Sequence, residues 1–292
     1  MSSNPYFAPV AESARLEASK ILRASKQEGQ CPLDLKQLLA WASYELRFVR
    51  ISEQGVGARA VQSEGEWWIE VDCAGSDRDD DFASSDTARR RQRFSVAHEL
   101  GHLTFKSHCD IPLQNRLLDF DNPHSTSYRL QKEAQANEFA TELLLPHRIF
   151  RECLKGLDFR SNLFASLEQI SDKFDVSLTA VAKRAAAFLD IPAMAMYFAP
   201  DGKTHQIPSS SKFSRDAGFY FEKGWPLPEL SLAKRILDGV HADSWGRQEY
   251  VDTRVWFPHR KKKEQYSVVE WCKALGQYGV LVILELIELD EY

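Results

Sequence analysis

The chain has few cysteines, and they are not spaced as a structural site would require. They are odd in number, scattered along 292 residues, and include no C-x-x-C pair. This pattern argues against both a disulfide framework and a zinc site made of cysteine ligands. We expect free thiols, as in a reducing cytoplasm, at Cys31, Cys73, Cys109, Cys153 and Cys272.

Long apolar runs and an excess of one charge are also missing. No stretch approaches the roughly 18 apolar residues of a membrane-spanning helix, and the N-terminal sequence has no apolar segment behind a basic start. We therefore expect a cytoplasmic protein with no membrane partner. The net charge of −5 and the pI near 5.9 provide no global attraction to nucleic acid.

The composition is otherwise that of a globular protein. Hydrophobic residues make up 43% of the chain and charged residues 27%, so a core can form. A chain of 292 residues exceeds the usual size of one core. The pattern changes near Pro192 from helical periodicity to short apolar runs. The expected class is α+β, in three parts: 1–150, 151–191 and 192–292.

Hydrophobic periodicity predicts the main elements. In the first part we expect two helices within residues 8–41, strands at 46–51 and 66–72, and helices at 94–105 and 133–145. Residues 74–91 and 106–128 lack this periodicity and are expected to be polar loops. The last part is interpreted as an α/β module, with strand-like runs at 193–199, 218–221, 255–257 and 280–287 and a helix at 230–237.

The segment RFSVAHELGHLTF contains H-E-x-x-H on a predicted helix. Residues four apart lie about 40° from each other on a helix, so His98 and His102 can bind one metal ion together. Glu99 is rotated by about 100° from His98 and is placed to accept a proton from a metal-activated water. An isolated match of this kind also fits a helix with two locally hydrogen-bonded histidines, so a third ligand is the stronger test.

Two residues are candidates for that third ligand. His108 has the spacing of the H-E-x-x-H-x-x-G-x-x-H class, but Phe105 stands where that class has its glycine. Glu133 lies on the edge of the apolar stripe of the helix EAQANEFATELLLP, which favours an inward carboxylate. The alternative for Glu133 is a first-turn residue that interacts with the helix dipole. We favour Glu133 as the ligand and His108 as a surface residue.

Other polar residues are candidates for supporting roles. Asn137, one turn after Glu133, is suited to orient a ligand. A peptidase also needs a group that stabilises the carbonyl oxygen. Spacing alone does not choose among four candidates for that role: Tyr128, His124, Arg93 and His147.

The H-E-x-x-H segment and the segment that begins at Glu133 together resemble the ImmA/IrrE family of bacterial metallopeptidases. RFSVAHELGHL is followed some thirty residues later by E-x-x-A-N-x-F-A-x-x-L-L-x-P, and the resemblance extends over about residues 30–190. It implies a zincin-like peptidase domain with His98, His102 and Glu133 as zinc ligands and Glu99 as the catalytic residue. It also implies a cytoplasmic protease that cuts a helix-turn-helix repressor, and a three-domain arrangement with a helix-turn-helix-like unit and a GAF-like domain.

The segment 163–189 resembles a helix-turn-helix, with Ser177 suited to cap its second helix. That helix offers chiefly Thr179, Lys183 and Arg184 among alanines, which is little for DNA recognition. We expect a packing unit instead. In the last part, the basic run at 259–263 is expected to be a solvated loop. Four tryptophans are core residues or, less favoured, line a small-molecule pocket: Trp225, Trp245, Trp256 and Trp271.

The leading hypothesis is a zinc endopeptidase of restricted specificity that acts on an XRE-type helix-turn-helix repressor in a stress or DNA-damage response. The strand EWWIEVD, if it forms a sheet edge beside the cleft, could hold the substrate by strand addition. The alternative is a DNA-binding regulator with a structural or vestigial metal site. Two imidazoles and a carboxylate also accept Mn²⁺ or Fe²⁺. The last part is expected to regulate the enzyme, with a possible small-molecule signal.

Overall fold

The computed structural model of the chain describes most of its residues. The described ranges are 7–53, 56–74, 81–105, 123–155, 162–189, 191–204, 209–212, 214, 218–219, 221–240, 245–258 and 266–288. Compact packing divides the chain into two units, residues 1–156 with 169–177 and residues 157–168 with 178–292. Among the described helices, none is both long and apolar enough to cross a membrane.

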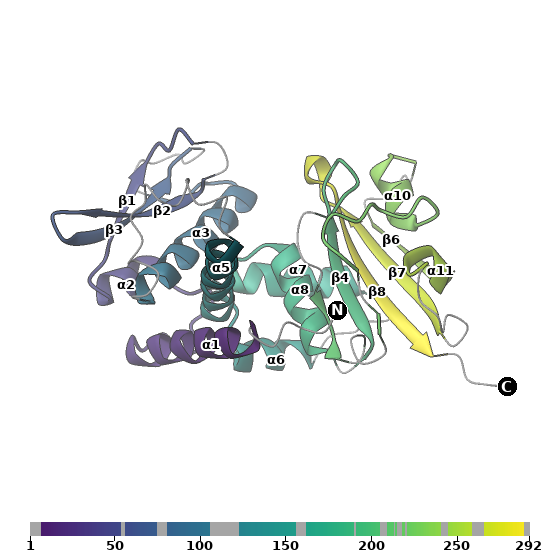
Figure 1. Ribbon diagram of the computed structural model, residues 1–292, viewed down its shortest axis with the longest axis horizontal. Coiled ribbons are helices and arrows are strands. Elements are labelled where there is room, and N and C mark those ends of the chain that lie inside the picture. The colour runs from purple at the N-terminus through teal and green to yellow at the C-terminus, as the bar shows by residue number, and fades with distance from the viewer. Residues whose placement is uncertain are drawn as a thin grey trace. The chain divides into compact units, whose positions relative to one another are not determined.

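The β part of the first unit is a three-stranded sheet (Figure 1). It contains β1 (Glu45–Val49), β2 (Ala58–Ser63) and β3 (Glu66–Asp72), in the order β1-β3-β2. β1 is parallel to β3, and β2 is antiparallel to β3. Glu64 and Gly65 join β2 to β3 with φ angles of 54° and 86°, as in a two-residue type I′ hairpin. The sequence did not predict β2. The expectation that EWWIEVD forms an edge is wrong, because β3 is the central strand.

The helix α3 (Asp86–Thr104) begins earlier than predicted. Ser85 caps it, since its hydroxyl accepts a hydrogen bond from the Ala88 amide at 3.3 Å. Residues 86–91 are therefore helical, whereas we expected a loop to 91. Their charged side chains gave no hydrophobic period to detect. Further along, Val96, Ala97 and Leu100 are buried, which fixes the face of α3 that points into the core.

The helix α5 (Pro123–Leu144) packs beside α3 and also begins earlier than predicted. Its apolar stripe, Ala136, Phe139, Ala140 and Leu143, is fully buried. Because α5 starts ten residues before Glu133, that glutamate lies in the middle of the helix. The first-turn interpretation of Glu133 therefore does not apply. The described part of this unit also contains α1 (Phe7–Ala24), α2 (Leu35–Trp41) and α6 (His147–Leu154).

The predicted helical pair is present as α7 (Leu163–Phe174) and α8 (Leu178–Phe188). The segment 151–191, which we expected to be a unit of its own, contributes residues to both compact units. α8 packs on strands of the second unit and buries Val181, Ala182 and Ala185. Arg184, one of the three candidate DNA contacts, is 6% exposed. Packing therefore withdraws that side chain from solvent.

The second unit is built on a five-stranded antiparallel sheet (Figure 1). In sheet order its strands are β5 (Ser209–Ser210), β4 (Ala193–Phe198), β8 (Val280–Glu288), β7 (Tyr266–Ala274) and β6 (Trp245–Asp252). This arrangement corrects the α/β interpretation, because neighbouring strands run in opposite directions. The expected mixture of helices and strands is confirmed. Short elements complete the unit: α10 (Leu232–Leu237), α11 (Thr253–Trp256) and η2 (Gly276–Tyr278).

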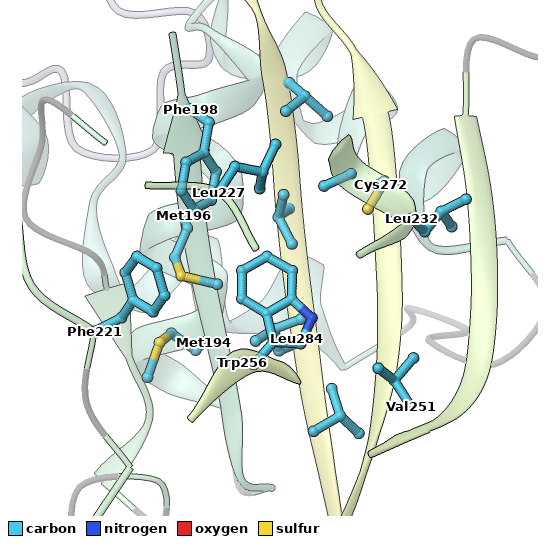
Figure 2. Close-up of a cluster of buried hydrophobic side chains, with 14 of the residues drawn as sticks. Met194, Met196, Phe198, Phe221, Leu227, Leu232, Val251, Trp256, Cys272 and Leu284 are labelled. Atoms are coloured by element: carbon cyan, nitrogen blue, oxygen red, sulfur yellow. The ribbon is translucent and has the colours of Figure 1, made fainter. Parts of the chain in front are cut away.

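Helices cover both faces of this sheet. α8 packs on β4, β5 and β8, while α10 packs on β6, β7 and β8 and α11 packs on β6 and β7. Burial on both faces explains why β4 and β8 read as continuous apolar runs. Figure 2 shows the core under α11, where Trp256 lies among Met196, Phe221 and Leu284.

The details of the second unit agree with some of the sequence predictions and differ from others. Residues 255–257, expected as a strand, lie in and directly after the short helix α11. The strands β6 and β7 were not predicted. Trp256 and Trp271 are 0% and 2% exposed, so they are core residues. The basic run at 259–263 lies outside the described residues.

Candidate metal centre

The helices α3 and α5 approach each other closely at a glycine. A Cβ atom added to Gly101 would lie 3.1 Å from Phe139 Cδ1 and 3.2 Å from the Ala136 Cα. A side chain at this position would force its neighbours to shift by a few tenths of an ångström, so glycine suits this separation. The close approach places Glu133, one turn before Ala136, opposite His98 and His102.

The three expected ligands lie together. Among the described residues, His98, His102 and Glu133 are one group whose possible ligand atoms all lie within 4.8 Å of one another. The two Nε2 atoms are 3.0 Å apart. The Glu133 carboxylate lies 3.3 Å from His98 Nε2 and 3.6 Å from His102 Nε2. Ligands of a tetrahedral zinc ion at about 2.0–2.1 Å from the metal are about 3.3 Å from each other, so this donor set fits such an ion.

Electrostatics also favours a cation at this position. Hydrogen bonds from His102 and His98 hold the pKa of Glu133 well below its usual value, so the carboxylate is ionised. Burial alone would lower the pKa of His98, but the hydrogen bond to Glu133 and the charges of Glu99 and Glu133 outweigh it and raise this pKa. The site therefore carries negative charge and stabilises positive charge.

Asn137 is placed to orient a ligand. Its Oδ1 lies 3.0 Å from His98 Nδ1, and an amide oxygen only accepts hydrogen bonds. This contact favours a proton on His98 Nδ1, and in the neutral form of that tautomer the Nε2 lone pair is available to a metal. Asn137 itself is held by helix α5, one turn after Glu133.

Glu99 is not part of this ligand group. Its Oε2 accepts a hydrogen bond from the Ala60 amide of β2 at 2.9 Å. Since Ala60 N–H points to Glu99 rather than to β3, the outward backbone groups of β2 are those of Ala58, Ala60 and Gln62. The free edge of the sheet that lies beside Glu99 is therefore β2, not the predicted β3.

The four residues considered as stabilisers of the carbonyl oxygen lie in different parts of the structure. The Arg93 guanidinium is buried and donates to the carbonyls of Leu33 and Asp175 at 2.9 and 3.2 Å. His147 follows Pro146 beyond the end of α5, about 16 Å or more along that helix from Glu133. The side chains of Tyr128 and His124, in the first turns of α5, lie outside the described residues, as does His108.

Sequence reasoning did not find two of the residues that contact the centre or its helix. Ala60 contacts Glu99 through its backbone amide, and almost any residue type has such an amide, so the sequence does not indicate this contact. Asp175 receives the side chains of three arginines from α3, over 80 positions earlier in the chain. The basic run at 89–93 was visible, but its partner was not.

Comparison with known families supports the peptidase assignment. Residues 82–186 match the model of the M78 peptidases, described as the IrrE N-terminal-like domain. The resemblance to the ImmA/IrrE family is confirmed over this segment. No curated protein matches the chain. A solved structure named as a Mycobacterium tuberculosis transcriptional regulator is similar in fold, with a TM-score of 0.57 and 14% identity over 95% of this chain and 88% of that one.

Proposed function

We propose that the chain is a metal-dependent endopeptidase of restricted specificity. One observation carries the proposal: His98, His102 and Glu133 converge, while Glu99, next to His98 in sequence, remains outside this group and is held by β2. A purely structural site needs ligands but no adjacent carboxylate of this kind. The match to a peptidase family over residues 82–186 supports the same function.

The residues fit a hydrolytic mechanism. A bound Zn²⁺ would supply a Lewis acid for the scissile carbonyl and its water. Glu99 accepts the proton of the attacking water and passes it to the leaving amine. The outward backbone groups of β2 hold an extended substrate segment by strand addition. Substrate pairing with Ala60 would compete for the amide that holds Glu99, which would release the carboxylate as the peptide arrives.

We further propose zinc as the metal, a cytoplasmic location, and an XRE-type helix-turn-helix repressor as the substrate, in a stress or DNA-damage response. The resemblance to the ImmA/IrrE family supports these assignments. Mn²⁺ and Fe²⁺ suit the same ligands. The second unit is proposed as a GAF-like regulatory domain that receives a small-molecule signal.

The test is to incubate the purified chain with the repressor encoded beside its gene. We expect a single cut that requires metal, is lost with a chelator and returns with Zn²⁺. Glu99→Gln, which keeps the side-chain volume but removes the base, is the matched control. Cleavage that continues in this variant, with metal content verified, would contradict the proposal.

The second candidate function is a DNA-binding regulator with a structural or vestigial metal site. The name of the structurally similar mycobacterial protein favours it. The burial of Arg184 and the packing of α8 on the sheet oppose it, because a recognition helix must present its side chains to DNA. Sequence-specific binding of duplex DNA at physiological salt, without cleavage of any repressor, would promote this alternative.

A further inference from the structure

Three arginines on α3 converge on one carboxylate outside the metal centre. Arg89 donates to both oxygens of Asp175, at 2.9 and 3.0 Å. Arg90 Nε reaches the same carboxylate at 3.3 Å, and Arg93 Nε lies 3.2 Å from it. These arginines lie between five and nine positions before His98 on the same helix. Asp175 therefore fixes the N-terminal half of the metal-binding helix, and Arg93 extends the link to the Leu33 carbonyl.

The helix is continuous from Asp86 to Thr104, so these positions are related to His98 by the regular helical rotation. Arg93 is rotated by about 140° from His98 around the helix axis. By the same rotation Arg89 is about 180° and Arg90 about 80° from His98, so the arginines hold the back and one flank of α3, away from the two histidines.

Asp175 is itself held in a defined place. Its φ angle is 50°, a left-handed conformation that aspartate and asparagine tolerate better than most residues. On either side of it, Ser171 Oγ donates to the Val176 carbonyl at 2.6 Å, and Arg90 donates to Ser171 Oγ at 2.9 Å. The turn after α7 is thus a rigid anchor for the three arginines.

Stability alone is a weak reason for such a network. The side chains of Asp175, Arg93 and Arg90 are 13%, 8% and 15% exposed. Burying charges costs desolvation energy that an ion pair recovers only in part. Such pairs are better suited to select one geometry than to add net stability. Here the geometry that is selected is the rotation of α3 about its own axis.

The metal centre depends on that rotation. A histidine Nε2 lies about 6 Å from a helix axis, so turning α3 by about 5° would move it by about 0.5 Å. Metal–ligand distances tolerate only about 0.2 Å. At this level α3 meets α5 through Gly101, which has no side chain of its own and lies against the backbone of Ala136 and the ring of Phe139.

We propose that Asp175 is a positioning residue of the metal centre, acting through Arg89, Arg90 and Arg93 to set the orientation of His98 and His102. This inference rests on the proposed metal-dependent function. It assigns to Arg93 a role in holding the helix rather than in contacting substrate.

The test compares two variants of the full-length chain. Asp175→Asn keeps the volume and the tolerance for a positive φ angle but removes the charge. Asp172→Asn is the matched control, because Asp172 is 72% exposed and, in the part of the chain that the structure describes, forms an ion pair with Arg90 alone, at 2.7 Å. Zinc dissociation constants are measured by competition with a chromophoric chelator, at a temperature where circular dichroism shows both variants folded. The visible spectrum of the Co²⁺-loaded proteins reports the coordination geometry.

We expect zinc binding about tenfold weaker in Asp175→Asn, the lower end of the range for groups that orient ligands, with an altered Co²⁺ spectrum. Asp172→Asn should stay within about twofold of the wild type. Unchanged affinity and spectrum in Asp175→Asn, or an equal loss in Asp172→Asn, would overturn the inference. If Asp175→Asn does not fold, Arg89→Gln takes its place with the same expectations. A zinc-loaded wild type that cuts no repressor would instead contradict the proposed function, and it would leave the comparison of affinities intact.

Discussion

The substitution Gly101→Ala tests how α3 and α5 build the metal centre. The new Cβ would lie 3.1 Å from Phe139 Cδ1, 3.2 Å from the Ala136 Cα and 3.3 Å from the Ala136 carbonyl oxygen. Carbon atoms prefer separations of about 3.5–4.0 Å. The helices must therefore move apart by a few tenths of an ångström, because two of the three contacts are with the backbone of α5.

The expected effect on stability is modest, since two contributions oppose each other. Overpacking a core costs about 1–3 kcal/mol, while replacing glycine by alanine within a helix stabilises it by up to about 1 kcal/mol. We expect the free energy of unfolding of the metal-free protein to fall by about 0–2 kcal/mol. The effect on metal binding should be larger, because Glu133 moves with α5 by more than the roughly 0.2 Å that coordination tolerates.

Two measurements check this reasoning. Denaturant unfolding of the metal-free variant gives the stability, and chelator competition gives the zinc affinity, which we expect to fall about tenfold, as when a ligand-orienting group is lost. The double variant Gly101→Ala with Phe139→Leu should recover only part of the loss, because the contacts with Ala136 remain. A Gly101→Ala protein that is more stable than the wild type and binds zinc equally well would refute the close-approach argument.

Further outcomes follow from the same geometry. Glu133→Ala should lower bound metal in elemental analysis, and His108→Ala should not; the reverse result would exchange the two as third ligand. Glu99→Gln should retain zinc but cut the cognate repressor at least about a hundredfold more slowly in a gel assay. Burial alone would raise the pKa of Asp175, but the hydrogen bond from Arg89 and the charges of Arg93 and Arg89 outweigh it, and the pKa is lowered. The ionised carboxylate therefore adds to the free energy of unfolding at neutral pH, and this contribution is lost as the pH falls below about 4. Denaturant unfolding should therefore show the stability difference between wild type and Asp175→Asn shrinking from pH 7 to pH 3, and a constant difference would contradict this. Purified protein should retain duplex DNA only weakly in a mobility-shift assay, with strong salt dependence.

The metal ligands could be predicted because they are spaced by one helical turn along short segments of the sequence. His98 and His102 are one helical turn apart, and Glu133 and Asn137 are also one turn apart on a second helix. The signal for the close packing of these helices, Gly101 beside His102, is equally local. By contrast, the starts of α3 and α5 were misplaced because their first turns are polar or charged. Hydrophobic periodicity reports only the turns that face a core.

The strands were harder to predict than the helices. β2 alternates small and polar residues, and Ala58 and Ala60 are buried without the bulky side chains that usually mark a strand. The short helix α11 was mistaken for a strand because residues 255–257 are all apolar. A run of three apolar residues carries no period, so either element fits it.

The sequence could not reveal the contacts of the centre that are made between residues far apart in the chain. Ala60 holds Glu99 through a backbone amide, which any residue except proline supplies. Asp175 holds α3 through arginines more than 80 positions away, and its own neighbours predict only a turn. Spacing identifies which groups carry the chemistry because ligands on one helix are related by a fixed rotation. The orientation of that helix is set by residues from other elements, so mutational tests of this centre need Asp175 and Gly101 as much as the ligands themselves.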